Sequence, residues 1–255
     1  MDLPKACLFD LDDTILADNA VSDVCWREAC EEWVSRNPGT DPGIDPGVLA
    51  CSILEARDSF FSDQEKLRWL SLNLPESRAQ VVLKAFAGLG IDYPESALPL
   101  ALRFDSIKKA RIELFPGAID TLPHLQRNGQ KLALITNGTQ RLQKEKIVRF
   151  NLEPLFDCIV IEGAYDIGKP DRRVFDFALD ELGVSAVDAW MIGYSLVNDI
   201  AGAQAAGVYA IWVDWKKTGL PKTGIPGKSA AVPDRIIHSI AELAANGGAP
   251  MGFYT

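Results

Sequence analysis

Cysteine and histidine are scarce in this chain of 255 residues, which contains five cysteines and two histidines. The cysteines stand at Cys7, Cys25, Cys30, Cys51 and Cys158. Their number is odd and none form a CxxC pair, which argues against both a zinc-binding motif and a disulfide framework. We therefore expect buried, reduced thiols.

Long apolar runs are also absent. No run reaches the roughly 18 apolar residues that a membrane span requires. Residues 1–5 show neither the basic region nor the apolar stretch of a signal peptide. The formal net charge of −9 disfavours nucleic acid or an anionic membrane as a partner. We predict a cytosolic protein that binds neither membranes nor nucleic acid, and the sequence leaves the number of subunits open.

Short apolar runs alternate with longer helical patterns along most of the chain. The runs at residues 6–9, 132–135, 158–161, 189–192 and 209–213 are typical of strands buried on both faces. Helical patterns follow at residues 118–128, 140–150, 172–182 and 199–206. This alternation predicts an α/β fold with a doubly wound, Rossmann-like parallel sheet and right-handed crossovers.

The first two predicted strands are separated by far more residues than one crossover needs. The intervening segment has helical patterns at residues 18–35, 47–60, 63–72, 76–87 and 94–109. Its apolar stripes include Trp26, Trp33, Phe60, Phe61, Trp69 and Leu70, which we interpret as the core of a helical bundle. We predict a core domain of residues 1–17 and 113–255 with an all-helical domain, residues 18–112, inserted into it.

Reactive side chains follow four of the five predicted strands. The segments are Asp10-Leu11-Asp12-Asp13-Thr14, Thr136-Asn137-Gly138, Gly168-Lys169-Pro170 and Gly193-Tyr194-Ser195-Leu196-Val197-Asn198-Asp199. Any one of them alone is accounted for as well by a turn or an exposed lysine. Ligands of open parallel sheets bind beyond the carboxyl ends of the strands. Together, in this order, the four segments therefore predict a shared site.

This pattern resembles the haloacid dehalogenase-like superfamily, whose motifs are DxDxT, a Thr/Ser-bearing second motif, a lysine and an acidic fourth motif. The resemblance covers residues 5–16 and 113–213, and Gln143 and Lys146 stand at the spacing seen in many members. In position and character, the helical insert is similar to the C1-type cap of the phosphatase branch.

The resemblance implies roles for individual residues. Asp10 is the expected nucleophile, and Asp12 the acid and base that protonates the leaving group and then activates water. Thr136, Asn137 and Lys169 are expected to bind the phosphoryl group, with Thr136 and Lys169 also counted as catalytic. A Mg²⁺ ion is expected at Asp10, Asp12 and Asp199, because this hard cation prefers oxygen ligands.

We thus predict a Mg²⁺-dependent phosphatase acting on a small phosphorylated metabolite, such as a sugar phosphate or a nucleoside monophosphate. A phosphomutase is an alternative, and so is a family member that binds a phosphorylated ligand with little turnover. Asp12 argues against dehalogenation, since a halide leaving group needs no proton. Tyr194 stands where the family usually has a metal-binding aspartate, which predicts weaker metal binding.

Overall fold

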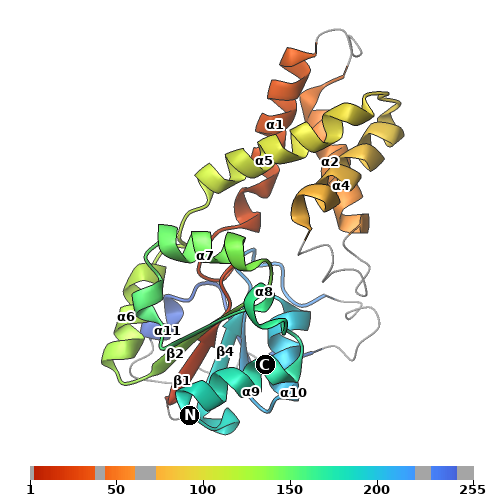
Figure 1. The fold of residues 1–255 in the computed structure, drawn as a ribbon. Helices are drawn as coiled ribbons and strands as arrows, with labels where there is room; N and C mark the ends of the chain where they lie inside the picture. The colour runs from red at the N-terminus through yellow and green to blue at the C-terminus, as the bar shows by residue number, and fades with distance from the viewer. Residues whose placement is uncertain (1–2, 38–43, 61–72, 222–230, 246–255) are drawn as a thin grey trace. The chain divides into compact units, whose positions relative to one another are not determined.

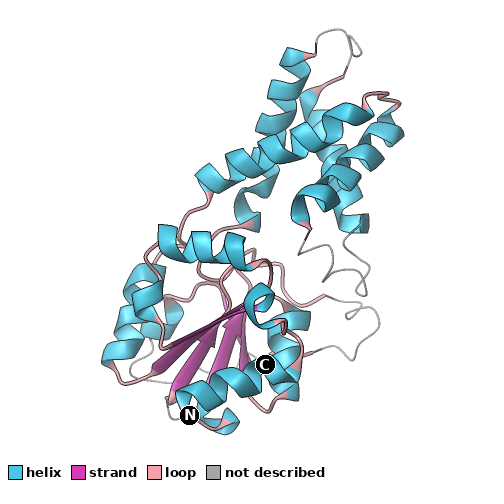
Figure 2. Cartoon of the chain, in the orientation of Figure 1, coloured by secondary structure: helices cyan, strands magenta, loops and turns pink. Residues whose placement is uncertain are grey.

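The computed structural model describes residues 3–37, 44–60, 73–221 and 231–245. The chain divides into two compact units, one formed by Met1–Ala17 with Leu114–Thr255 and the other by Asp18–Glu113. The first is an α/β unit, and the described part of the second consists of helices and turns, as the colours of Figure 2 show.

A six-stranded parallel sheet forms the centre of the α/β unit. Its strands are β1 (Ala6–Phe9), β2 (Lys131–Thr136), β3 (Cys158–Ile161), β4 (Ala189–Gly193), β5 (Tyr209–Val213) and β6 (Arg235–Ile237). They lie in the order β3-β2-β1-β4-β5-β6, which confirms the predicted doubly wound α/β fold. The sixth strand was not predicted, because three residues at a sheet edge give almost no pattern.

Helices cover the two faces of this sheet. Helix α9 (Arg172–Leu182) buries Val174, Phe175 and Ala178 against Ala6 and Leu8 of β1. Helix α10 (Gly202–Ala205) lies beside α9, while α6 (Ala118–Arg127) and α11 (Glu242–Ala245) lie together on the opposite side in Figure 1. Because both faces are covered, the strands are apolar at almost every position.

Side-chain caps fix where two helices near the strand ends begin. Helix α7 (Gln140–Arg149) starts after Thr139, whose hydroxyl accepts a hydrogen bond of 3.4 Å from the Leu142 N–H. Helix α9 starts after Asp171, whose Oδ1 accepts one of 3.0 Å from the Arg173 N–H. Such caps satisfy N–H groups that a helix start leaves without partners. The two capping residues also mark the ends of the loops that follow Thr136 and contain Lys169.

Two short helices differ from the sequence prediction. Helix α8 (Glu162–Tyr165) follows β3 directly and was not predicted. After β4, the chain forms a π-helical turn, η5 (Leu196–Ala201), before α10 begins. The helix predicted at residues 199–206 therefore begins three residues earlier, and its first part is a π-helical turn rather than an α-helix. Single π-helical turns occur often at functional sites, and this one carries Asp199.

The helical unit packs around aromatic side chains. Its helices are α1 (Ser22–Arg36), α2 (Pro46–Phe60), α4 (Leu74–Leu89) and α5 (Ala97–Arg111). Trp26 stacks on Phe104 with ring centroids 3.9 Å apart, and Trp33 is also buried. The predicted bundle core is confirmed for these two tryptophans. Phe61, Trp69, Leu70 and the predicted helix at 63–72 lie outside the described residues.

Charged side chains are buried in the helical unit in matched pairs. The Lys108 ammonium pairs with the Asp18 carboxylate, and their side chains are 8% and 11% exposed. Arg78 pairs in the same way with Asp105. Both cations also approach the ring of Phe104, at 5.9 Å for Lys108 and 5.2 Å for Arg78. The Lys108–Asp18 pair is thus buried and the Arg78–Asp105 pair half-buried, and in each a cation lies beside a carboxylate.

The chain leaves and re-enters the α/β unit at neighbouring points. Leu16 and Leu114 form an antiparallel bridge, and the Phe115 N–H donates a hydrogen bond of 2.9 Å to the Ile15 carbonyl. The two ends of the insertion are therefore held together within the α/β unit itself.

The cysteines are free thiols, as predicted, but they are not all buried. Burial raises the pKa of Cys7 and of Cys30 to about 12. Cys51 is exposed, so the prediction of burial is wrong for this residue. It lies on α2 outside the buried stripe of Leu49, Ala50 and Ile53. Among the described residues, no helix combines the length and the apolar character that crossing a membrane requires.

Candidate active site

The predicted site residues gather at the carboxyl ends of the central strands. Asp10 follows β1, Thr136 ends β2 and Asp199 lies in the turn after β4. Strand β1 lies between β2 and β4, where the strand order reverses direction. Doubly wound sheets bind their ligands at this switch point.

A buried lysine joins the first and fourth motifs. Lys169 Nζ lies 2.7 Å from Asp10 Oδ1 and 2.7 Å from Asp199 Oδ1. All three side chains are at most 8% exposed. A Cβ atom at Gly193 would stand 2.4 Å from the Asp199 carboxyl, so only glycine lets this carboxylate approach β4 so closely.

The surroundings of Asp10 set its protonation. Burial raises the pKa of the Asp10 carboxyl to about 7; the Lys169 ammonium opposes this shift and the Asp199 carboxylate adds to it. Burial alone would lower the pKa of Lys169, but Asp10 and Asp199 raise it overall. The lysine therefore stays charged. Thr14, the last residue of the first motif, was given no role in the sequence analysis, and its hydroxyl donates a hydrogen bond of 3.1 Å to Asp10 Oδ2.

Helix α7 holds Asp12. Lys146 Nζ lies 2.7 Å from Asp12 Oδ1, and Gln143 Nε2 donates to Asp12 Oδ2 at 2.9 Å. The same Gln143 amide donates to Thr136 Oγ1 at 2.5 Å. A hydroxyl that accepts a hydrogen bond can still donate its own proton to a ligand oxygen. Gln143 and Lys146, noted in the sequence for their spacing alone, thus link the first motif to the second.

Asn137 connects the second motif to the third. Its Nδ2 donates to the Lys169 carbonyl at 2.7 Å, and its Oδ1 accepts from the Lys169 N–H at 2.9 Å. This reciprocal pair occupies both ends of the side-chain amide. The side chain predicted to bind the substrate therefore holds the backbone of Lys169, and any phosphoryl contact by Asn137 remains a prediction.

A second residue that the sequence analysis did not identify lies behind these loops. Glu162 is 3% exposed, and its Oε2 accepts a hydrogen bond of 2.9 Å from the Gly138 N–H. An acidic residue directly after the buried strand β3 was a usable signal, since Asp10 follows β1 in the same way.

Tyr194 is 36% exposed at the end of β4. Although the residue as a whole is partly exposed, desolvation of the phenol group and then the nearby carboxylates of Asp13 and Asp10 raise the pKa of Tyr194 well above its ordinary value. The side chain therefore remains a neutral phenol. Its backbone carbonyl accepts a hydrogen bond of 2.7 Å from Trp212 Nε1, which fixes the chain at this point.

The donor set suits a hard divalent cation. Four carboxylates, those of Asp10, Asp12, Asp13 and Asp199, lie close enough to act on Tyr194, whereas Lys146 and Lys169 supply the ammonium groups that pair with them. Asp199 Oδ1 accepts no hydrogen bond of regular geometry from the described residues. Four carboxyl groups thus lie near two ammonium groups, an excess of acidic side chains that suits a bound cation.

The three predicted metal ligands do not form a complete set of side chains. The described residues contain no group of three His, Cys, Asp or Glu side chains arranged to hold a metal ion. The carboxylate of Asp12 is itself held by Lys146 and Gln143. Mg²⁺ commonly binds through one or two carboxylates, with waters and substrate phosphate completing its shell. Asp10 and Asp199 are sufficient for that arrangement.

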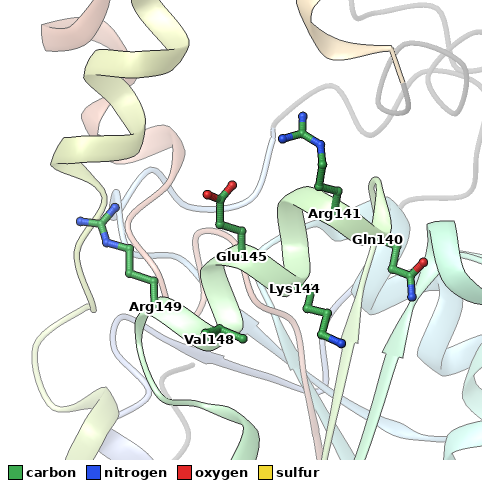
Figure 3. Close-up of a pocket in the computed structure, with 6 residues that line it drawn as sticks. All are labelled: Gln140, Arg141, Lys144, Glu145, Val148 and Arg149. Atoms are coloured by element: carbon green, nitrogen blue, oxygen red, sulfur yellow. The ribbon is translucent and has the colours of Figure 1, made fainter.

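A shallow depression on α7 is separate from this site. Figure 3 shows its lining side chains, which all come from this one helix: Gln140, Arg141, Lys144, Glu145, Val148 and Arg149. None of them is a predicted site residue. Gln143 and Lys146 leave the same helix toward Asp12, so the depression lies on a different part of the helix surface.

Comparisons with known proteins agree with this geometry. The family model described as haloacid dehalogenase-like hydrolase matches residues 4–207. Phosphoserine phosphatase of Thermus thermophilus is 35% identical, over 82% of this chain and 88% of the relative. Glyceraldehyde 3-phosphate phosphatase of Pyrococcus abyssi is 27% identical, over 84% and 82%.

Solved structures show the same fold. The putative hydrolase YfnB of Bacillus subtilis, a structure bound to magnesium, superposes with a TM-score of 0.72 at 20% identity. The match covers 96% of this chain and 99% of that one. The four motifs meet at one end of the sheet and the family model spans most of the sequence, so the chain belongs to the haloacid dehalogenase-like hydrolases.

Proposed function

We propose that this hydrolase removes phosphate from a small phosphorylated metabolite in the cytosol, with Asp10 as the nucleophile. The observation that carries the proposal is the buried Lys169 ammonium, 2.7 Å from both Asp10 and Asp199. A phosphate monoester is dianionic, and it can approach a carboxylate nucleophile only where fixed positive charge reduces the repulsion.

In the first step, Asp10 attacks phosphorus. A bond forms between a carboxylate oxygen and phosphorus while the bond from phosphorus to the leaving oxygen breaks. Asp12 donates its proton to that leaving oxygen, which departs as an alcohol. Lys169 and Thr136 stabilise the charge on the phosphoryl oxygens, and Thr136 is held for this purpose by Gln143.

In the second step, water releases phosphate. Asp12, now a carboxylate, takes a proton from the water as its oxygen bonds to phosphorus. The bond between Asp10 and phosphorus breaks, and Asp10 is regenerated. Lys146 and Gln143 keep Asp12 oriented through both steps, because they hold its two carboxylate oxygens.

Mg²⁺ is the proposed cofactor, held by Asp10 and Asp199. When bound, it supplies positive charge that draws the phosphate and the nucleophile together. The excess of carboxylates over ammonium groups at the site supports this assignment. The magnesium bound to the YfnB structure is consistent with it.

The relatives suggest the class of substrate. Those named above are phosphatases of phosphoserine and of glyceraldehyde 3-phosphate, both small phosphorylated metabolites. We propose a substrate of this size and keep sugar phosphates and nucleoside monophosphates in the set to be tested. We further propose that the helical unit Asp18–Glu113 selects among them as a cap. Replacing it with a short linker should damage discrimination more than activity on nitrophenyl phosphate.

A panel assay tests the proposal. Purified protein should hydrolyse p-nitrophenyl phosphate and at least one small phosphometabolite, with activity lost in EDTA and restored by Mg²⁺. A protein that binds phosphorylated compounds without turnover would support the degenerate alternative. Transfer of the phosphoryl group between positions of a sugar, without release of phosphate, would identify a phosphomutase.

A further inference from the structure

Glu162 occupies a position that the proposed mechanism does not use. Its carboxyl is buried inside the α/β unit, 3% exposed, at the junction of β3 and α8. A buried carboxylate without a role would be costly, because it gives up its hydration. Its contacts lead to the two loops that carry Thr136 and Lys169.

The first contact is with the loop after β2. Glu162 Oε2 accepts a hydrogen bond of 2.9 Å from the Gly138 N–H. The residue after Glu162 contacts the same loop, since the Gly163 N–H donates a hydrogen bond of 3.0 Å to the Gly138 carbonyl. Gly138 has a φ of +113°, a conformation that side chains disfavour. Both polar groups of Gly138 are therefore held by the start of α8.

The second contact is with the loop that carries Lys169. A Cβ atom at Gly168 would stand 2.8 Å from Glu162 Oε1 and 2.7 Å from its Cδ. The backbone of Gly168 thus rests directly on the carboxyl group. Asn137, the residue before Gly138, then bonds the backbone of Lys169 in both directions.

We propose that Glu162 is a positioning residue that fixes the Thr136 loop and the Lys169 loop relative to each other. It does so from behind the site, through Gly138 and Gly168, without touching the substrate. Displacing a reacting group by about 1 Å can cost about a hundredfold in rate. The inference rests on the proposed function, since the loops matter through the phosphoryl group they bind.

The test is a double-mutant cycle with Lys169. Glu162→Ala should lower kcat/KM for p-nitrophenyl phosphate roughly 10–100-fold and weaken the binding of orthovanadate, a phosphate analogue, by a similar factor. In a Lys169→Ala background the same change should cost clearly less, because one of the two groups being positioned is absent. Equal losses in both backgrounds would overturn the proposal.

Three further variants separate positioning from simple destabilisation. Val174→Ala, a change in the buried face of α9, should lower stability and leave kcat/KM within about threefold at temperatures where the protein is folded. Glu162→Gln keeps an acceptor for Gly138 and should recover most of the activity. Gly168→Ala pushes on the carboxyl and should be harmful alone but add little to Glu162→Ala.

The outcomes distinguish the two proposals. If the wild-type protein binds vanadate but has no activity, the phosphatase function is overturned. The role of Glu162 is then tested by the double-mutant cycle measured with vanadate affinity alone. An active wild type with additive losses overturns the role of Glu162 and leaves the function standing. If Glu162→Ala does not fold, the Gln and Gly168 variants decide: a Gln variant as weak as Gly168→Ala contradicts the bond to Gly138. A wild type that neither turns over nor binds vanadate counts against both.

Discussion

The two units bury charge in different ways. In the helical unit, Lys108 has Asp18 and Arg78 has Asp105, so the charges balance pair by pair. In the α/β unit, one ammonium group, Lys169, serves both Asp10 and Asp199. A buried carboxylate that has its own cation is compatible with a purely structural role. Two buried carboxylates that share one ammonium group favour the binding of a further cation. The imbalance therefore supports the proposal that the α/β unit binds a cation.

Removing the nucleophile is the largest expected effect on activity. Asp10→Asn should lower kcat about 10⁴-fold or more, because an amide cannot attack phosphorus. The melting temperature in metal-free buffer should stay level or rise, since one carboxylate leaves a crowded acidic site. Activity assays and thermal melts on the same sample check both parts. Residual activity above about a tenth of wild type would exclude Asp10 as the nucleophile.

Removing the shared cation compares the two units directly. Lys169→Met leaves two buried carboxylates without a cation and should destabilise the fold by about 3–5 kcal/mol while lowering kcat/KM roughly 10²–10³-fold. Lys108→Met, its counterpart in the helical unit, should destabilise by a similar amount. Below its melting temperature, its activity on p-nitrophenyl phosphate should be close to wild type. Denaturation curves measure the loss of stability and initial rates measure the loss of activity. Equal losses of activity in Lys169→Met and Lys108→Met would contradict the proposed difference between the two units.

The acid role of Asp12 predicts dependence on the leaving group. Asp12→Asn should slow alkyl phosphates roughly 10²–10⁴-fold and nitrophenyl phosphate far less, because nitrophenolate hardly needs a proton. Asp105→Asn in the helical unit is the matched control and should show no such dependence. A series of aryl and alkyl phosphates provides the measurement. Equal losses across the series would remove Asp12 from the acid role.

The smallest expected effect concerns Tyr194. Tyr194→Asp adds a carboxylate where the family usually has one, and it should tighten Mg²⁺ binding roughly tenfold after desolvation is counted. Tyr194→Phe leaves the charge unchanged and should leave Mg²⁺ affinity unchanged. Calorimetric titration of Mg²⁺, followed by activity assays, checks both. Unchanged metal affinity with slower turnover would mean that Tyr194 acts on the substrate itself.

The sequence was sufficient for five of the six strands and for assigning four of the predicted site residues to one edge of the sheet. Strands β1, β3 and β5 begin and end where predicted, because a short, unbroken apolar run between turn signals is typical of a buried strand. Asp10, Thr136, Lys169 and Asp199 could be assigned to one site because parallel strands end at one edge. None of this required knowledge of side-chain contacts.

The remaining features depend on contacts between distant residues. Glu162 is a single acidic residue in sequence, and its importance comes from Gly138 and Gly168 meeting it in space. The hydrogen bonds from Lys146 and Gln143 to Asp12 have no local sequence pattern either. The exposure of Cys51 was missed because its position on the outer face of α2 outweighs the usual preference of cysteine for burial.

The bridge between Leu16 and Leu114 bears on how such a protein can change over evolution. Since the α/β unit closes this junction with its own backbone hydrogen bonds, the inserted segment is thermodynamically a long surface loop. Shortening such a loop eightfold alters the entropy of closing it by only about 1.8 kcal/mol. Selection can therefore lengthen, trim or replace the helical insert at little cost to the stability of the sheet.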